Sequence, residues 1–247
     1  MKKLVVGSSL EEASMNILKE LGDVADVLVC NSPIVELEEL RGVKNRLVIV
    51  ASPHSSSAGF VSLSVHSPGN FGEAKNGGEP GKLGVAPALF LGEALRKLRE
   101  IKERKGLKHL VTLEVTHHGP TFNLPTIFVE LGSDTRGWRS RAGAKAAAET
   151  VRHLLDVEPE GEASIGVGGP HYAPKFTRLT LDGKNLGHIC PKYALQWLDG
   201  KMLSQMIERT TPRPERLILE WKGIPSEHKK RVMNLAESSG LIIEKLR

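Results

Sequence analysis

The sequence predicts an α/β protein with an open sheet and a crevice at its strand ends, on three observations. Apolar, β-branched segments alternate with helical apolar stripes along the 247 residues, which is typical of a sheet covered by helices. Residues 46–51 are nearly all apolar, as expected of a strand buried on both faces. The sequence contains no internal repeat and no linker, so residues 1–247 are predicted to form one domain.

The composition is that of an ordinary globular protein, with 40% apolar and 26% charged residues. No run of about 18 apolar residues occurs, so no membrane-spanning helix is expected. The N-terminus carries only a short apolar run at positions 4–6, which is too little for a signal peptide. We therefore expect a cytoplasmic protein, a monomer without a membrane partner.

Cysteine usage limits the kind of metal site that the chain can build. Cys30 and Cys190 lie far apart and outside any CxxC spacing, so neither a zinc ribbon nor a disulfide framework is expected. Both are predicted as small core residues. Any metal must therefore be held by histidines and carboxylates. The net charge of +5 is compatible with a polyanionic partner, while 4% aromatic residues argue against base stacking as the main binding mode.

The first elements alternate between strand and helix. Residues 3–7 predict a strand, and Ser8 or Ser9 is suited to cap a helix whose apolar stripe ends before Gly22. Residues 24–30 and 46–51 predict further strands. His54 follows the last of these at its carboxyl end, in a loop at 52–59 that is too small and polar to belong to the core.

Residues 60–66 alternate cleanly and predict a strand that ends in a histidine. Its odd positions are apolar, and Ser62, Ser64 and His66 face the other way. A turn at 67–70 would hold Asn70 close to His66. An imidazole beside an amide is a plausible proton-transfer pair, and the alternative is a solvated loop histidine.

Residues 71–85 are rich in glycine, lysine and glutamate and form a connection long enough to indicate a functional loop. Its glycines, with Lys75 and Lys82, would let backbone amides approach a phosphate, although no P-loop motif is present. A helix is predicted from Pro87 to Arg104. Its basic end is interpreted as a solvated face rather than a nucleic-acid patch.

Residues 110–118 predict a central strand that ends in a polar turn before Gly119 and Pro120. On a regular strand, one face carries Thr112, Glu114, Thr116 and His118, and the other carries Leu113, Val115 and His117. A carboxylate and an imidazole at a strand end suit metal binding or acid/base chemistry, and the alternative is a structural hydrogen bond. Adjacent histidines on a regular strand cannot both reach one ion.

The next strand is predicted at 125–132 and places Glu130 between two apolar residues, where a buried charge needs a partner. An alanine-rich helix follows at 138–155, and then a strand at 163–169. Residues 170–177 are predicted as a stiff loop with His171 and Tyr172. Its Lys175 and Thr177 are candidates to contact phosphate or carboxylate.

The C-terminal third continues the alternation. Residues 187–193 are predicted as a turn containing His188, with Pro191 suited to the first turn of a helix. The remaining elements are predicted as a helix at 196–209, a strand at 217–221, a helix at 226–238 and a strand at 241–245.

Six segments, taken together and in this order, resemble the D-aminoacyl-tRNA deacylases of the archaeal and plant type. They are EASMNI (12–17), SVHSPGNFGEAK (64–75), HHGPT (117–121), FVELGS (128–133), GGPHYAPKFT (168–177) and GHICPKY (187–193). The resemblance implies a hydrolase that cleaves the ester between a D-amino acid and tRNA. It also implies two zinc ions per chain and a single-domain αβα sandwich with a mixed sheet, similar to phosphorylase and peptidyl-tRNA hydrolase.

Two positions depart from the family pattern. His54 is usually flanked by basic residues, whereas serine and proline surround it here. Pro170 stands where glycine is more usual, so a backbone amide donor is lost at that position.

Under this resemblance the site residues are assigned to three roles. The catalytic residues are expected to be His66, Asn70, Glu114 and His118, and the metal ligands His54, His117, Glu130 and His171. Substrate contacts are expected from Lys75, Gly168, Gly169, Tyr172, Lys175 and Thr177. One alternative is a metal-independent esterase that uses His66 and Asn70, and another is a tRNA-binding module without catalysis.

Overall fold

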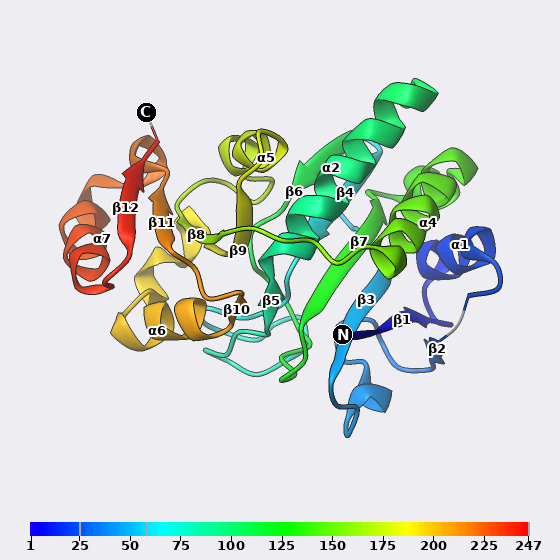
Figure 1. Ribbon diagram of the computed structural model, residues 1–247, viewed down its shortest axis with the longest axis horizontal. Coiled ribbons are helices and arrows are strands. Elements are labelled where there is room, and N and C mark those ends of the chain that lie inside the picture. Colours follow the sequence, from blue (N-terminus) through cyan, green and yellow to red (C-terminus); the bar gives the residue numbers. More distant parts are fainter. Residues whose placement is uncertain (25, 58, 247) are drawn as a thin grey trace.

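The strands gather in two main sheets, with helices packed against both (Figure 1). The computed structural model describes residues 1–24, 26–57 and 59–246. Ala25, in the predicted strand 24–30, Ala58, in the predicted loop 52–59, and Arg247, at the end of the predicted domain, lie outside the described residues. The fold class is α/β with a mixed sheet, as the sequence predicts.

The larger sheet has six strands in the order β2-β1-β3-β7-β4-β6. Their bounds are β1 Lys2–Ser8, β2 Val27–Cys30, β3 Arg46–Pro53, β4 Ser62–His66, β6 Leu110–Leu113 and β7 Thr126–Gly132. β4 runs antiparallel to β7, while the other neighbouring pairs are parallel. The register places both Ser52 of β3 and Ser64 of β4 opposite Glu130 of β7. A carboxylate is thereby centred between two hydroxyl side chains.

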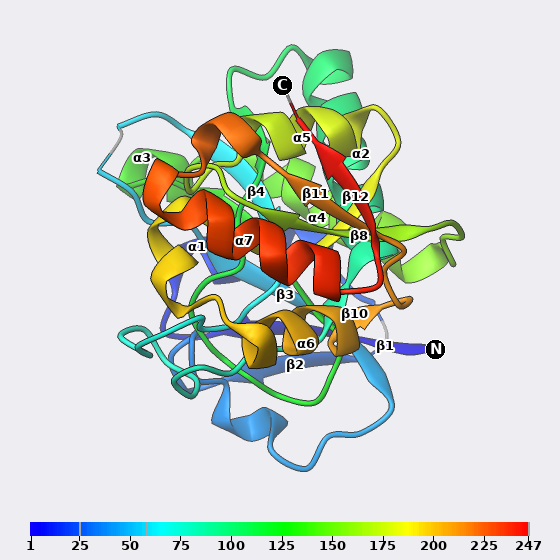
Figure 2. The same ribbon diagram turned by 90° about the vertical axis from the view of Figure 1, so that its left-hand side faces the viewer.

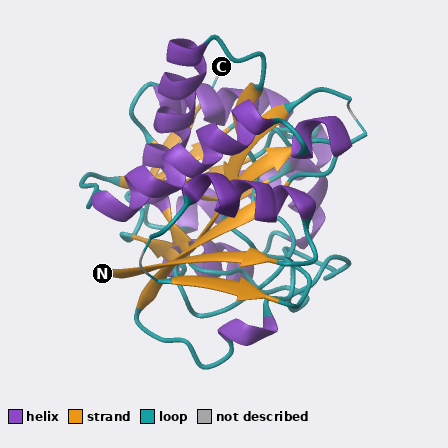
Figure 3. Ribbon diagram, turned by 90° about the vertical axis from the view of Figure 1, so that its right-hand side faces the viewer, coloured by secondary structure: helices purple, strands orange, loops and turns teal. Residues whose placement is uncertain are grey.

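Helices cover one face of this sheet and a short helical turn covers the other (Figure 3). The helices are α1 Glu12–Leu21, α2 Ala88–Lys105, α3 Thr135–Trp138 and α4 Arg141–Asp156, and the turn is η1 Glu38–Leu40. The small buried side chains of Ala146 and Ala147 let α4 approach the sheet closely. The largest core cluster contains residues of both sheets, such as Leu63 and Ile218, so the two share one apolar interior.

The smaller main sheet has four parallel strands in the order β12-β11-β8-β9. Its strands are β8 Ala163–Val167, β9 Asn185–Cys190, β11 Arg216–Leu219 and β12 Ile242–Lys245. Two helices, α6 Gly200–Glu208 and α7 Ser226–Ser238, cover one face of it, as Figure 2 shows. The remaining elements are α5 Pro174–Leu181, the paired β5 Ala86–Pro87 and β10 Thr210–Thr211, η2 Lys192–Trp197 and η3 Trp221–Gly223.

Three sequence predictions are wrong in ways that matter for the site. The strand predicted through His118 ends at Leu113, and His118 adopts a positive φ of 44°. The loop predicted at 170–177 gives way to α5 at Pro174, so Lys175 and Thr177 are helical. The turn predicted at 187–193 is largely the buried strand β9, because its backbone pairs with β8.

Other boundaries shift without changing the architecture. The helix predicted at 196–209 begins only at Gly200, because Asp199 caps it by accepting a hydrogen bond from the Met202 amide at 2.8 Å. The helix predicted at 138–155 begins only at Arg141, as α4, with Ser140 as its cap, and the separate short helix α3 ends at Trp138. Among the described residues, no helix is long and apolar enough to cross a membrane.

We expect the Phe128→Ala substitution to destabilise the protein by about 3–5 kcal/mol, the usual cost of removing a buried aromatic side chain. Phe128 is fully buried in β7 and packs in the cluster between the sheet and η1. The measurement is the free energy of unfolding in urea. Phe60→Ala is the matched control, because this side chain is 37% exposed and its loss is expected to cost under about 1 kcal/mol. Equal effects in the two variants would contradict the prediction.

Candidate metal centre and active site

Glu130 lies at the centre of the site, buried in the middle of β7. Ser52 and Ser64 donate hydrogen bonds to its two oxygens, at 3.0 and 3.2 Å. Its Oε2 lies 3.2 Å from His54 Nδ1, and its Oε1 lies 3.4 Å from His66 Nε2. Burial by itself would raise the pKa of this carboxyl, but the neighbouring His66 and His54 hold that pKa well below its usual range. The buried charge that the sequence left without a partner is thus paired with two histidines.

A first cluster of candidate ligands contains His54, Glu114 and His171, whose ligand atoms lie within 4.8 Å of one another. His54 Nδ1 is 3.2 Å from Glu114 Oε1, and His171 Nε2 is 2.9 Å from Glu114 Oε2. Two tyrosines orient the imidazoles from outside. The Tyr172 hydroxyl is 3.0 Å from His54 Nε2, and the Tyr193 hydroxyl is 3.4 Å from His171 Nδ1.

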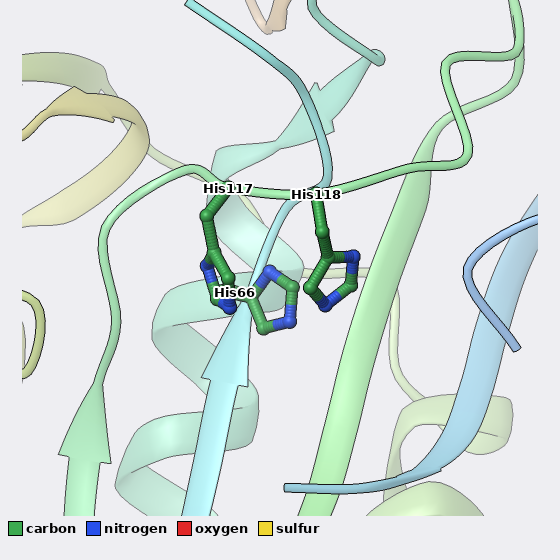
Figure 4. Close-up of side chains that lie close together, drawn as sticks. All are labelled: His66, His117 and His118. Atoms are coloured by element: carbon green, nitrogen blue, oxygen red, sulfur yellow. The ribbon is translucent and has the colours of Figure 1, made fainter. Parts of the chain in front are cut away.

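A second cluster contains His66, His117 and His118, and again one ligand atom of each lies within 4.8 Å of the others (Figure 4). His66 ends β4, whereas His117 and His118 follow one another after β6. The expectation that adjacent histidines cannot both reach one ion holds for a regular strand, and the chain leaves the strand after Leu113. Because His118 adopts φ of 44°, both rings turn toward His66, with ring centroids 4.1 and 4.7 Å from it.

Hydrogen bonds to carbonyl groups select one tautomer for His117 and His118. Nδ1 of His117 donates to the Val115 carbonyl at 2.8 Å, and Nδ1 of His118 donates to the Gly119 carbonyl. Each ring therefore keeps its Nε2 lone pair for another partner, which is how metal-ligating histidines are usually oriented. Burial lowers the pKa of His117 well below its usual value and lowers the pKa of His118 to about 4, so both are neutral.

The pKa values of the other two buried imidazoles in the clusters, His54 and His66, shift in the opposite direction. Burial alone would lower the pKa of His54, but its hydrogen bond to Glu130 and the Glu114 charge raise it to about 10. Burial alone would also lower the pKa of His66, but the Glu130 charge outweighs this effect and raises that pKa. Protons on these imidazoles balance the buried carboxylates, and a bound cation would supply the same compensation.

Several buried polar atoms of the clusters lack a hydrogen-bond partner within the described part of the chain. They are both oxygens of Glu114 and both ring nitrogens of His66. The Glu114 oxygens lie within ion-pair distance of ring nitrogens of three histidines, but these contacts do not have the geometry of hydrogen bonds. A buried polar atom without a partner costs about 1–3 kcal/mol. The two clusters together can hold metal ions, because a cation between such atoms would satisfy them.

Asn70 is not in hydrogen-bond contact with His66 among the described residues. Its side-chain amide donates to the carbonyls of Gly77 and Glu79, at 2.9 and 3.3 Å, and so fastens the loop at 71–85. Asn70 nevertheless lines a hollow of about 340 Å³ that reaches His117, His118 and His171. Lys75 lies at the same hollow, with its ammonium 3.0 Å from Glu73.

The other predicted substrate-binding residues lie around the clusters with different partners. Thr177 is buried and its hydroxyl accepts the Leu113 amide at 3.0 Å, which ties α5 to β6. Lys175 lies 3.7 Å from Glu220. Gly169 adopts φ of 81°, and a Cβ there would come within 2.5 Å of the Glu220 carboxylate. Gly168 adopts φ of 105° beside the same residue.

Sequence reasoning missed several residues that shape the site. Ser52 and Ser64 were not assigned to Glu130, and Trp138 donates its indole N–H to the His54 carbonyl at 2.8 Å. Tyr193 and Trp197 line the hollow but received no role. For Tyr193 a signal existed, because it ends the family-like segment at 187–193. Trp197 carried no comparable signal.

The fold and the two buried clusters define an α/β protein with a candidate metal centre at its strand ends. A sequence model of the family described as D-aminoacyl-tRNA deacylase matches residues 41–244. The chain therefore belongs to the D-aminoacyl-tRNA deacylase family, and it is an enzyme.

Individual relatives agree with this assignment. A D-aminoacyl-tRNA deacylase of Ignicoccus hospitalis is 40% identical over 90% of this chain and 89% of its own length. One from Pyrococcus horikoshii is 31% identical over 97% of this chain and 98% of its own length. The solved structure titled a conserved protein of unknown function, AF0625, matches with a TM-score of 0.90 and 30% identity, covering 99% of this chain and 95% of that one.

Proposed function

We propose that this protein hydrolyses the ester bond of D-aminoacyl-tRNA to give a free D-amino acid and tRNA, with zinc held by the two clusters. The observation that carries the proposal is that both clusters meet at Glu130, next to a hollow of about 340 Å³. Family membership supports the choice of ester.

The donor set supports zinc, with one ion for each cluster. His54, Glu114 and His171 would hold one ion, and His66, His117 and His118 would hold the other, with Glu130 between them. Imidazole and carboxylate ligands suit zinc, and three protein ligands per ion leave a position for a reacting group, as in catalytic zinc sites. The two cysteines, Cys30 and Cys190, are buried outside both clusters.

When bound, zinc would supply the Lewis acidity that polarises the ester carbonyl and acidifies a water molecule. Glu114 is the candidate general base, since one of its two oxygens is enough to bind an ion and the other can accept a proton. Water adds to the ester carbon as this carboxylate takes its proton. The proton then passes to the ribose oxygen as the carbon–oxygen bond breaks, which releases the amino acid and the tRNA.

The contacts of Asn70 favour this mechanism over the metal-independent one. A pair made of His66 and Asn70 would need the amide to face the imidazole, whereas the amide donates to two loop carbonyls and the imidazole faces Glu130. A binding module without catalysis would leave the buried carboxylates unexplained, because phosphate recognition needs cations rather than anions. Lys75, whose side chain is 80% exposed at the hollow, would serve the phosphates of the tRNA.

The test of the proposed function compares deacylation of D-tyrosyl-tRNA with that of L-tyrosyl-tRNA by the purified, zinc-loaded protein. We expect the D-ester to be cleaved at least about 100-fold faster than the L-ester, because positioned polar groups in a site can discriminate between substrates by a factor of this size. Spontaneous hydrolysis of both esters without protein is the control. Equal rates would contradict selectivity for the D-ester, and no cleavage of either ester would leave only tRNA binding.

A further inference from the structure

We propose that the hollow beside the clusters receives the 3′-terminal adenosine of the substrate, with the adenine stacked on the Trp197 and Tyr193 side chains. This inference rests on the proposed function, because it places the ester at the clusters. The hollow is lined by three cluster histidines, His117, His118 and His171, and by an aromatic wall of Phe71, Tyr193 and Trp197. An ester carbonyl held at these histidines therefore has its own nucleoside beside the aromatic wall.

The aromatic wall uses residues that are scarce in this protein. The chain has two tyrosines and three tryptophans, and both tyrosines contact cluster histidines. Trp197 is 41% exposed and Tyr193 is 52% exposed, although large apolar side chains are normally withdrawn from water. Exposed rings beside a catalytic cluster indicate a ligand with a flat face, and base stacking on aromatic side chains has this requirement.

Trp197 is held rigidly in place by two sets of contacts. A Cβ at Gly72 would come within 2.4 Å of the indole, so the loop backbone lies directly against that ring. The backbone around Trp197 is held as well, because the Arg231 guanidinium of α7 donates to the carbonyls of Leu195 and Leu198, which flank Trp197 in sequence. A wall ordered before binding loses little conformational entropy when a base stacks on it.

A rigid wall fits the constant part of the substrate better than its variable part. Amino acid side chains differ in size and shape between substrates, whereas every tRNA ends in the same adenosine. Polar groups at the edge of the hollow complete the match. Asn76 and Lys75 line it near the aromatic residues, and the exposed Lys75 ammonium would serve the phosphate of that nucleotide.

Tyr193 links the wall to the first cluster, because its hydroxyl is 3.4 Å from His171 Nδ1. The two parts of this side chain should therefore be separable by substitution. Tyr193→Phe keeps the ring and is expected to preserve KM while lowering kcat, since His171 loses an outer partner. Tyr193→Ala removes the ring as well and is expected to raise KM.

The test uses a non-hydrolysable probe, 3′-(D-alanylamino)-3′-deoxyadenosine, and its counterpart in which a methyl group replaces the adenine on the ribose, as inhibitors of D-tyrosyl-tRNA cleavage by the zinc-loaded protein. We expect the adenosine probe to bind about 5- to 150-fold more tightly, the factor that one base–aromatic stack contributes. Trp197→Ala should abolish this preference and raise KM by a similar factor at unchanged kcat. Trp197→Phe should restore most of the adenosine preference and bring KM most of the way back. Trp221→Phe alters a tryptophan outside the hollow and should leave the preference and KM unchanged.

Two results would overturn the inference: equal inhibition by the two probes, or a preference that survives in a Trp197→Ala protein shown by thermal melting to be folded. Equilibrium binding of both probes, measured by calorimetry, separates this inference from the proposed function. An adenosine preference without D-ester cleavage would sink the proposed function and leave the nucleoside pocket. D-ester cleavage without that preference would sink the pocket alone.

Discussion

Replacing Glu130 with glutamine is expected to lower kcat for D-tyrosyl-tRNA at least about 100-fold and to lower the zinc content of the purified protein. Glu130 is within 3.4 Å of a histidine from each cluster and accepts hydrogen bonds from Ser52 and Ser64. Glutamine keeps the shape of this side chain but removes the negative charge. Without that charge, Glu114 would be the one carboxylate of the site left to balance two divalent cations in the buried clusters.

The measurement combines single-turnover deacylation with metal analysis by mass spectrometry. Glu38→Gln is the matched control, because this carboxylate on η1 is 58% exposed and lies outside the clusters. A Glu130→Gln protein with full activity and two zinc ions would show that Glu130 does not join the clusters. A loss of activity with full zinc content would shift its role from metal binding to the handling of protons.

Chelation is expected to reduce D-tyrosyl-tRNA cleavage to below about 1% of its starting rate, with recovery when zinc is added back. The physical reason is that the reaction needs a polarised carbonyl, while the imidazoles and carboxylates of the described site already pair with one another when no ion is bound. The melting temperature should fall in parallel, because an ion that binds only the folded state stabilises it by about 4 kcal/mol at 1,000 times its Kd.

The control for chelation is a His117→Ala/His54→Ala protein, which lacks one ligand in each cluster. Its residual activity and its melting temperature should respond little to chelator. If D-ester cleavage by the unaltered protein persists after complete metal removal, the metal-independent mechanism with His66 and Asn70 is favoured. In that case Asn70→Ala should abolish turnover, rather than only loosen the loop that its amide fastens.

Local sequence patterns were sufficient for many of the elements and for most of the reactive residues. The helices predicted from Pro87 to Arg104 and at 226–238 correspond closely to α2 and α7, and the buried run at 46–51 became β3 in the sheet interior. Four of the six cluster residues, His66, His117, His118 and His171, lie in the six family-like segments, whereas His54 and Glu114 lie outside them. Periodicity and side-chain chemistry are properties of neighbouring residues, so they can be read without the fold.

Sequence patterns failed where a conformation depends on distant partners. Residues 185–190 resemble a turn locally but form a strand, because β8 offers a parallel neighbour. Residues 114–118 alternate as a strand would, yet they leave the sheet after Leu113, and the backbone amide of Gly69 donates to the His118 carbonyl at 2.7 Å. Tertiary packing overrides local preference at such positions.

The sequence by itself therefore determined the α/β class, the family and the chemical character of the candidate site, which offers nitrogen and oxygen donors rather than thiolates. Only the tertiary structure decided how these residues are grouped. Ser52 and Ser64 are 78 and 66 residues away from Glu130 in the sequence and become its neighbours through the pairing of β3, β7 and β4. The positive φ of His118 likewise turns two adjacent histidines toward one point. Strand order and single backbone dihedrals are set by the packing of the whole chain, and the site depends on both.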